Sequence, residues 1–203
     1  MSNLSDLLPA GAAAKQLTFT DSGSGIATKK PVILNSDGTV TEVGSTTTSA
    51  GLGAKAVFES SDSGYMDIAY DTANSRVCVI YRDDGGTTYA KACVGSISGK
   101  TITWGTPTTF ESADTYSKAI CYDTNSGKML VVFKHSSDGN GHGIVGTIDA
   151  ASNSISFGSE AVFASGGVNH LKLAYDANAQ KSVIVYSDVG NSSYGTGIVA
   201  TIS

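Results

Sequence analysis

Charged residues are scarce in this chain. They make up 15% of its 203 residues and leave a net charge of −5, whereas soluble domains usually contain roughly 25% charged residues. Lys29 and Lys30 form the basic pair that stands out. Nucleic acid is not an expected partner, because contacts to phosphates require clustered lysine and arginine.

Long apolar runs and cysteine motifs are also missing. No run approaches the roughly 18 residues that a spanning helix needs, so membrane insertion is not expected. The three cysteines are an odd number without a close pairing motif, which indicates neither a disulfide framework nor a zinc site. Because Cys78, Cys93 and Cys121 each lie in an apolar stretch, we expect buried free thiols. No metal and no cofactor is expected.

Small polar residues and strand formers fill the sequence instead. The chain has 24 glycines and many serines and threonines, which favour turns, while valine, isoleucine, tyrosine and phenylalanine favour strands. Periodic runs of helix formers are nearly absent. This mixture predicts an all-β protein with many tight turns.

An internal repeat of about 52 residues organises most of the chain. Three markers recur in step, at spacings of 52 and then 53 residues. They are a phenylalanine (Phe58, Phe110, Phe163), a Tyr-Asp pair (Tyr70 and Asp71, Tyr122 and Asp123, Tyr175 and Asp176) and a strand aromatic (Tyr81, Phe133, Tyr186). A fixed period of this length is typical of proteins built from repeated structural units.

Each repeat predicts four short strands. In the first repeat they cover residues 66–70, 76–82, 90–97 and 101–104, the last continuing to residue 110. The short turns between them predict antiparallel neighbours. Unbroken apolar runs at residues 77–81 and 129–133 indicate strands that are buried on both faces. The predicted fold is all-β, with four-stranded antiparallel blade repeats of the β-propeller type.

The third repeat lacks its fourth strand, because the sequence stops at Ser203 after the third. A matching strand stands in front of the array, at residues 53–60. We therefore expect residues 54–58 to pair with residues 197–202, in the same chain or in a neighbour. Three blades are too few for a ring, since propellers have about four to eight. Combination of chains into a homo-oligomer, a longer repeat array and an open or prism-like arrangement all remain compatible with this count.

Residues 1–50 lie outside the repeat. A strand is predicted at residues 16–20, and the turn residues Asn-Ser-Asp-Gly predict a hairpin between residues 30–34 and 39–43. Residues 44–50 have the composition of a flexible linker. The predicted organisation is a small N-terminal β arm with its linker, residues 1–50, followed by a three-blade body, residues 51–203. An arm of this kind is expected to anchor the body to something larger.

Two stretches resemble a known group of proteins. Residues 2–12, Ser-Asn-Leu-Ser-Asp-Leu-Leu-Pro-Ala-Gly-Ala, and residues 31–40, Pro-Val-Ile-Leu-Asn-Ser-Asp-Gly-Thr-Val, resemble the N-terminus of virion proteins of marine tailed bacteriophages. The repeat, with Val-Phe-Glu-Ser at 57–60 and Ile-Val-Gly-Thr-Ile at 144–148, is similar to repeat arrays of phage fibre proteins. The resemblance implies a structural protein of the virion, whose arm binds other virion proteins through residues 1–50 while the body projects.

The loops between second and third strands are the candidate binding regions. Residues 82–89, 135–142 and 187–194 resemble the Asp-box of sialidase-like propellers, in which aspartate and glycine shape the turn. A sharper hypothesis is binding of host-surface glycans, with aromatic rings stacking on a sugar and charged groups bonding its hydroxyls. The candidates are Arg82, Asp83, Asp84, Tyr89, His142, Asp188 and Tyr194. Calcium is less favoured, because the Asp-x-Asp ligand spacing is missing.

Catalysis is not expected. A glycosidase needs a carboxylate pair, and a sialidase also needs an arginine cluster, whereas arginine is rare here. The recurring Tyr-Asp pairs favour a folding role, with tyrosine packed between blades and aspartate capping the turn. The expected function is adhesion to glycans by a fibre-like virion protein. The alternatives are a capsid or tail decoration protein without a ligand and, less favoured, a sialidase-like glycosidase.

Overall fold

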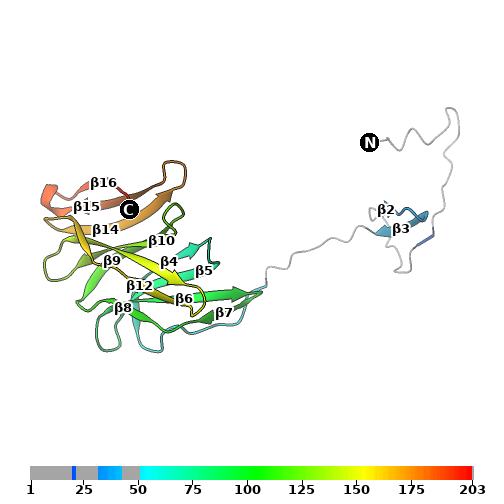
Figure 1. Cartoon of the computed structure of the whole chain (residues 1–203), viewed down its shortest axis with the longest axis horizontal. Helices are drawn as coiled ribbons and strands as arrows, with labels where there is room; N and C mark the ends of the chain where they lie inside the picture. The colour runs from blue at the N-terminus through cyan, green and yellow to red at the C-terminus, as the bar shows by residue number, and fades with distance from the viewer. Residues whose placement is uncertain (1–19, 22–31, 43–50, 203) are drawn as a thin grey trace. The chain divides into compact units, whose positions relative to one another are not determined.

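The structure is a computed structural model that describes residues 20–21, 32–42 and 51–202 (Figure 1). The chain divides into two units, Met1–Gly51 and Leu52–Ser203. In the first unit, β2 (Val32–Leu34) and β3 (Thr39–Glu42) form an antiparallel hairpin, and β1 (Thr20–Asp21) pairs with β3 in parallel. The hairpin was predicted from the turn residues. The linker at residues 44–50 and most of the predicted strand at residues 16–20 lie outside the described residues.

The second unit consists of three antiparallel sheets, one for each repeat. The first sheet contains β4 (Ser63–Asp71), β5 (Arg76–Asp83), β6 (Ala90–Ser98) and β7 (Thr101–Trp104), and β8 (Thr108–Glu111) also pairs with β6. The second contains β9 (Thr115–Asp123), β10 (Lys128–His135), β11 (Gly141–Asp149) and β12 (Ser154–Phe157), with β13 (Ala161–Ala164) on β11. The third contains β14 (Val168–Asp176), β15 (Lys181–Asp188) and β16 (Tyr194–Ala200). The predicted all-β repeat of four-stranded antiparallel sheets is confirmed.

The outer strand of the first two sheets is a single edge strand in two segments. β7 and β8 both pair with β6, as β12 and β13 both pair with β11. At the break, the amide of Gly105 donates to the carbonyl oxygen of Val94 at 2.8 Å, and Gly158 donates to Val145 at 3.0 Å. The break is therefore a regular feature of the repeat.

The core lies between the sheets, which follow one another from the third at the top of the body to the first at the bottom in Figure 1. Cys78 and Ile80 of β5 belong to the same buried cluster as Val131 and Phe133 of β10. The opposite face of β10 carries Leu130 and packs, with its neighbours, against the third sheet. β10 is therefore buried on both faces, which explains its apolar run without alternation. Each such side chain, fully buried, stabilises the fold by roughly 1.5–3 kcal/mol.

The recurring phenylalanines connect each sheet to the next. Phe110 of β8 packs on Phe133 and Phe157 of the second sheet, with ring centroids 5.7 and 5.2 Å apart. Phe163 of β13 packs on Tyr186 of the third sheet at 5.7 Å. The outer strand of one sheet thus contributes a phenylalanine that packs between this sheet and the next one.

One prediction about pairing is wrong within the chain. Residues 53–60 form no strand, and in the described part of the chain β16 pairs with β15 alone. The segment is held on the first sheet instead, where Trp104 Nε1 donates to the carbonyl oxygen of Ala56 at 3.1 Å. Phe58 packs on Tyr81 and Trp104 at 5.1 and 5.4 Å. Phe58 therefore packs on the first sheet in the same way that Phe110 packs on the second. The segment lies at the opposite end of the three sheets from the third sheet.

Candidate functional site

A strained β-bulge recurs at the start of the first strand in each of the three sheets of the second unit. The strand register shifts in β4, β9 and β14, and a non-glycine residue with positive φ lies at each shift: Tyr65 (51°), Ser117 (40°) and His170 (55°). Positive φ is uncommon for such residues and costs of order 1 kcal/mol or more. Bulges that persist at this cost often re-aim side chains beside functional sites. The three bulges therefore mark the candidate site.

A pocket of about 510 Å³ lies at these bulges, and we call it the bulge pocket. Two ties connect the second and third sheets at this point. Lys134 Nζ donates to Asn169 Oδ1 at 2.9 Å, and the Leu171 amide donates to Ser117 Oγ at 2.8 Å. The residues lining the pocket are Tyr65, Tyr116, Ser117, Lys134, Asn169 and His170. They combine aromatic rings with hydrogen-bond donors and contain no carboxylate.

Two tyrosines and an arginine are stacked at the first-sheet side of the pocket. Tyr65 and Tyr116 meet edge to face with centroids 5.6 Å apart, and the Arg82 guanidinium lies 4.5 and 5.2 Å from the two rings. Arg82 also pairs with Asp84 and, at 3.1 Å, with Asp114. The Tyr116 hydroxyl donates to Asp114 at 2.6 Å, which raises the pKa of that tyrosine. The rings are thereby fixed, which lowers the entropic cost of binding a ligand against them.

Lys118 is a buried cation behind this stack. Its Nζ lies 5.2 Å from the centre of the Tyr65 ring and donates to the carbonyl oxygen of Thr115 at 3.0 Å. Burial, and then the positive charge of Arg82, lower the pKa of Lys118 to about 8. A cation this far from solvent adds positive potential to the pocket at neutral pH.

The residues proposed from the sequence are distributed over three separate loops. Arg82 and Asp84 belong to the stack just described. Asp83 instead bonds Lys91 Nζ at 2.6 Å and the Gly85 amide at 3.2 Å, so its role in the loop is structural. Lys91 is shared with Glu59, at 3.4 Å. Within the described residues, no hydrogen bond or ion pair joins one of the three loops to another.

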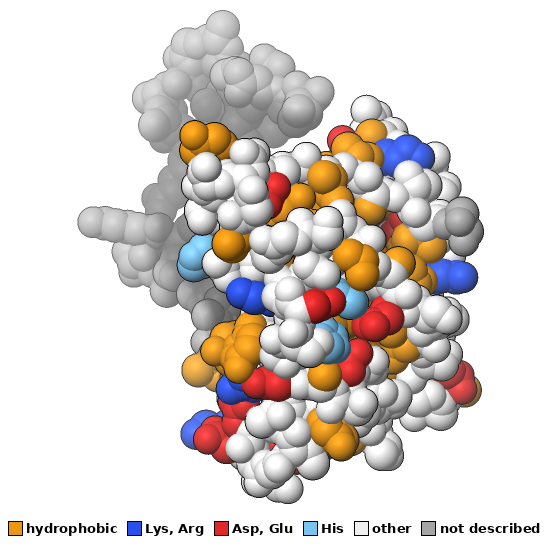
Figure 2. Space-filling model, turned by 90° about the vertical axis from the view of Figure 1, so that its left-hand side faces the viewer, with side chains coloured by type: hydrophobic (Ala, Val, Ile, Leu, Met, Phe, Trp, Pro, Cys, Tyr) orange, Lys and Arg blue, Asp and Glu red, His pale blue; other side chains and the backbone are white. Residues whose placement is uncertain are grey.

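His142 is buried rather than presented to solvent. It stacks against Phe133 and His135, with centroids 5.8 and 5.0 Å away, and its Nε2 lies 3.2 Å from Asp138. At 6% exposure, the His142 side chain is not presented for stacking on a sugar. Histidine and acidic side chains gather near the centre of the face seen in Figure 2.

The other three candidates lie away from the bulge pocket lining. Asp188 and Tyr194 face each other across β15 and β16, at the loop end of the third sheet. Tyr194 is exposed, and Tyr89 is exposed at the edge of its own loop. Of the residues predicted from the sequence, Arg82 and Asp84 thus lie at one side of the candidate site. The other five lie outside it.

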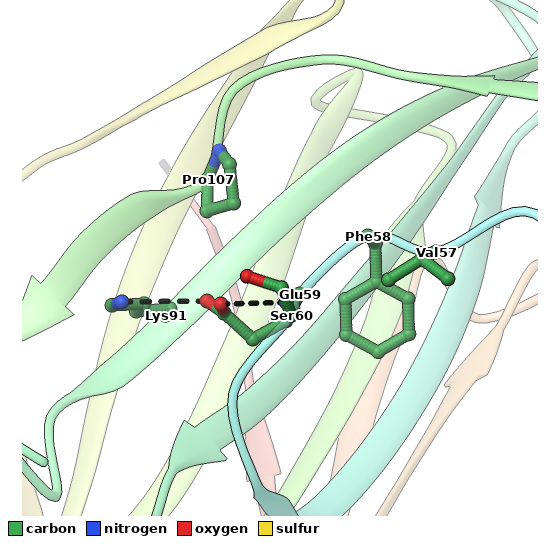
Figure 3. Close-up of a pocket in the computed structure, with 6 residues that line it drawn as sticks. All are labelled: Val57, Phe58, Glu59, Ser60, Lys91 and Pro107. Atoms are coloured by element: carbon green, nitrogen blue, oxygen red, sulfur yellow. Dashed lines mark hydrogen bonds and ion pairs between the residues drawn. The ribbon is translucent and has the colours of Figure 1, made fainter. Parts of the chain in front are cut away.

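A second pocket, of about 450 Å³, lies beside the segment at residues 57–60 (Figure 3). Glu59 is its central group, and it accepts hydrogen bonds from Ser61 and, at 3.0 Å, from the Tyr81 hydroxyl. The Ser61 bond is the main cause that lowers the pKa of Glu59 to about 2. Because Lys91 also pairs with this carboxylate, its bonding capacity is used within the protein. This cluster fastens the segment to the first sheet.

The recurring aspartates accept hydrogen bonds from turn amides in all three repeats. Asp71 Oδ1 accepts from Ala73 and Asn74, at 3.0 and 2.9 Å. Asp123 and Asp176 accept equivalent bonds between 2.8 and 3.0 Å. Burial and a hydrogen bond to Asp71 raise the pKa of Tyr122. These contacts are of the kind expected for capping aspartates and inter-sheet tyrosines.

Sequence reasoning missed most of the bulge pocket. Tyr65, Ser117 and His170 occupy one repeat position, since they are 52 and 53 residues apart. That spacing was a usable signal. However, the three residues share no chemistry, and nothing in the sequence marks tyrosine or histidine for positive φ.

Comparisons with known proteins bear on the fold. No family model matches the chain, and no curated protein matches it. The chain is similar to the crystal structure of the NanB sialidase from Streptococcus pneumoniae in complex with 2-[(3-chlorobenzyl)ammonio]ethanesulfonate, at a TM-score of 0.52 and 14% identity over 73% of this chain. NanB with Optactamide matches at 0.52 and 13%. The chain spans 25% and 24% of those proteins. This likeness shows a β-propeller-type fold.

Two further properties concern the described residues. They contain no helix long and apolar enough to cross a membrane. They also contain no group of three or more histidine, cysteine or acidic side chains that could hold a metal ion.

Proposed function

We propose that this protein is a virion structural protein whose β-repeat body adheres to acidic glycans through the bulge pocket, without catalysis. The observation that carries the proposal is the pair of tyrosine rings, Tyr65 and Tyr116, held against Arg82 at the edge of a pocket that is rich in donors. Fixed aromatic rings contact the apolar face of a sugar at low entropic cost. Surrounding donors then bond its hydroxyl groups.

The charge of the pocket supports an anionic sugar. Lys134 and His170 line it, and no carboxylate does. Lys118 adds a buried positive charge nearby. A sugar carboxylate or sulfate would therefore meet positive potential and ammonium donors, whereas a neutral sugar would gain hydrogen bonds alone.

Hydrolysis is not supported by the same geometry. Arg82 is paired with Asp84 and Asp114, so it is not free to clamp a sugar carboxylate. The Tyr116 hydroxyl donates to Asp114 with a raised pKa, which disfavours the tyrosinate that a nucleophile requires. We therefore assign binding and not bond cleavage to this pocket.

A glycan array with the full chain tests adhesion. We expect binding to carboxylated or sulfated glycans that weakens as salt is raised. Lys134→Ala should reduce that affinity about 10- to 150-fold, because a charge-assisted hydrogen bond contributes about 1.5–3 kcal/mol. Tyr194→Ala is the matched control and should leave binding unchanged. Absence of binding to any acidic or neutral glycan would overturn the adhesion proposal and favour a decoration protein without a ligand.

The virion role rests on the resemblance of residues 2–12 and 31–40 to phage virion proteins. Deleting residues 1–43 should abolish incorporation into particles, while the body keeps its fold and its glycan binding. The measurement is the amount of each protein in purified particles assembled with the full or the shortened chain. Equal incorporation of the two would show that the arm is not the anchor.

A further inference from the structure

The first sheet has an uncovered apolar face. On β4, Met66, Ile68 and Tyr70 are 57, 56 and 49% exposed. Their equivalents on β9, one repeat later, are Lys118, Ile120 and Tyr122, which are buried to 8% exposure or less in contact with the first sheet. The second sheet turns this apolar face toward the first sheet, whereas on the first sheet the same face is not covered by any other sheet of the second unit. We call it the leading face.

The third sheet has the complementary uncovered face. Val185 and Val199 are 45 and 66% exposed. The residue equivalent to Val185 in the second sheet is Val132, which is fully buried where the third sheet covers it. In the first sheet the equivalent is Ile80, buried under the second sheet. We call this surface of the third sheet the trailing face.

The edge of the third sheet is incomplete as well. Within the described residues, the outer edge of β16 carries no strand, whereas β6 and β11 each carry one in two segments. The sequence that matches the missing strand lies at residues 52–59, against the first sheet. Leu52 stands in the repeat position of Trp104 and Phe157 and is 99% exposed. The segment thus packs on the first sheet through its side chains, but it pairs with no strand among the described residues.

We propose that the leading face of one copy binds the trailing face of a second copy of this chain, and that residues 52–59 complete the third sheet of that copy. The occupant must carry both features that the two internal junctions use, an edge strand and an apolar β4-type face. This chain presents the two together. No rearrangement is needed, because Phe58 already packs on its own first sheet as Phe110 packs on the second.

The repeat fixes the register of the new pairing. Thr109 lies opposite Lys91, and Val162 lies opposite His142. The equivalent pair is Val57 opposite Thr196 of the partner subunit. The Gly105 and Gly158 amides donate to the carbonyl oxygens of Val94 and Val145, so the Gly53 amide should donate to Val199 of the partner subunit.

Two copies close the assembly. The leading and trailing faces are different surfaces, so the contact is heterologous and either closes into a ring or extends. Each copy supplies three sheets, and two copies give six, within the range of about four to eight blades that propellers adopt. A closed dimer leaves neither face exposed.

Mass measurement by light scattering tests the dimer. The full chain should have twice its 20.7 kDa mass, and Ile68→Lys on the leading face or Val185→Lys on the trailing face should each give monomers. Both residues are exposed in the single copy, so the fold should persist, which circular dichroism checks. Val162→Lys, on an exposed apolar residue of the second sheet, is the matched control and should remain dimeric.

Mixing the two monomeric variants separates this contact from other modes of association. The Val185→Lys chain keeps an intact leading face, and the Ile68→Lys chain keeps an intact trailing face. The mixture should therefore form a dimer of one copy of each variant, joined by one contact between these two faces. A monomeric wild-type chain, or variants that remain dimeric, would refute the proposal. So would a mixture that stays monomeric.

Cross-linking tests the register. The chain with Val57→Cys and Thr196→Cys should oxidise to a disulfide between two copies, while either single variant should not cross-link. The native cysteines are buried and should not interfere. A disulfide within one chain would show closure inside the chain and would overturn the intermolecular assignment.

Discussion

Replacing Lys118 by methionine should raise the free energy of unfolding at neutral pH. Burial lowers the pKa of Lys118 from 10.5 to about 8, and each pKa unit corresponds to about 1.4 kcal/mol. Keeping the side chain charged at pH 7 therefore costs about 3 kcal/mol. The variant loses the hydrogen bond from the charged Lys118 ammonium to the Thr115 carbonyl, which contributes about 1.5–3 kcal/mol. The expected net gain is about 1 kcal/mol.

The pH dependence gives the sharper test. Because the folded pKa is below the unfolded one, the unfolded chain binds more protons between about pH 8 and 10.5. Wild-type stability should therefore receive a positive contribution from Lys118 as pH rises through this window. The methionine variant lacks this contribution, so its stability relative to wild type should fall by about 2 kcal/mol between pH 7 and 10. Burial raises the pKa of Cys78 and Cys93, which acts in the opposite direction but cancels in the difference.

Urea unfolding followed by the fluorescence of Trp104, the single tryptophan of the chain, measures these differences at pH 7, 8, 9 and 10. Lys55→Met, at an exposed position, is the control and should show no such trend. If the Lys118→Met variant is less stable at pH 7, or if its difference from wild type is the same at every pH, the charged lysine does not carry this cost.

Three further substitutions test the packing of the body. A Cβ at Gly105 would overlap the carbonyl oxygen of Asn153, so Gly105→Ala should cost about 1–3 kcal/mol by urea unfolding; Gly86→Ala has open space and should be neutral. Phe133→Ala removes a fully buried ring and should lower the free energy of unfolding by about 3–5 kcal/mol, and a thermal midpoint unchanged from wild type would contradict the core assignment. Asp123→Ala removes the acceptor of the Asn125 and Ser126 amides, of which Asn125 keeps the Tyr175 hydroxyl at 3.2 Å, and should cost about 1–2 kcal/mol in chemical denaturation.

The fold could be predicted from the sequence because its signals are periodic. Phe58, Phe110 and Phe163 recur in step, and the unbroken apolar run around Phe133 requires a strand covered on both faces. The position of residues 53–60 was only half predictable. The match to β8 identifies residues 53–60 as an outer strand of the repeat. The repeat does not specify whether β16 of the same chain or of another copy pairs with it. Within one chain, three stacked sheets keep the two ends apart.

The candidate site was largely hidden from the sequence. Arg82 and Asp84 were accessible because they lie in a conspicuous loop. Tyr65 and His170 reach the pocket through backbone bulges with positive φ, a conformation that is uncommon for residues other than glycine. His142 was a glycan-binding candidate because it lies at the end of a polar loop, whereas the structure buries its side chain against Phe133 and His135.

The attachment of residues 52–60 to the first sheet has a mechanical consequence. In a single copy, tension from the N-terminus enters the body through this segment, which is held by Phe58, Glu59 and the bond from Trp104 to Ala56. Such a segment peels away one contact at a time. Paired with a strand of another copy, it would be loaded in shear, and its hydrogen bonds would have to break together. Assembly would then determine how much force the attachment withstands.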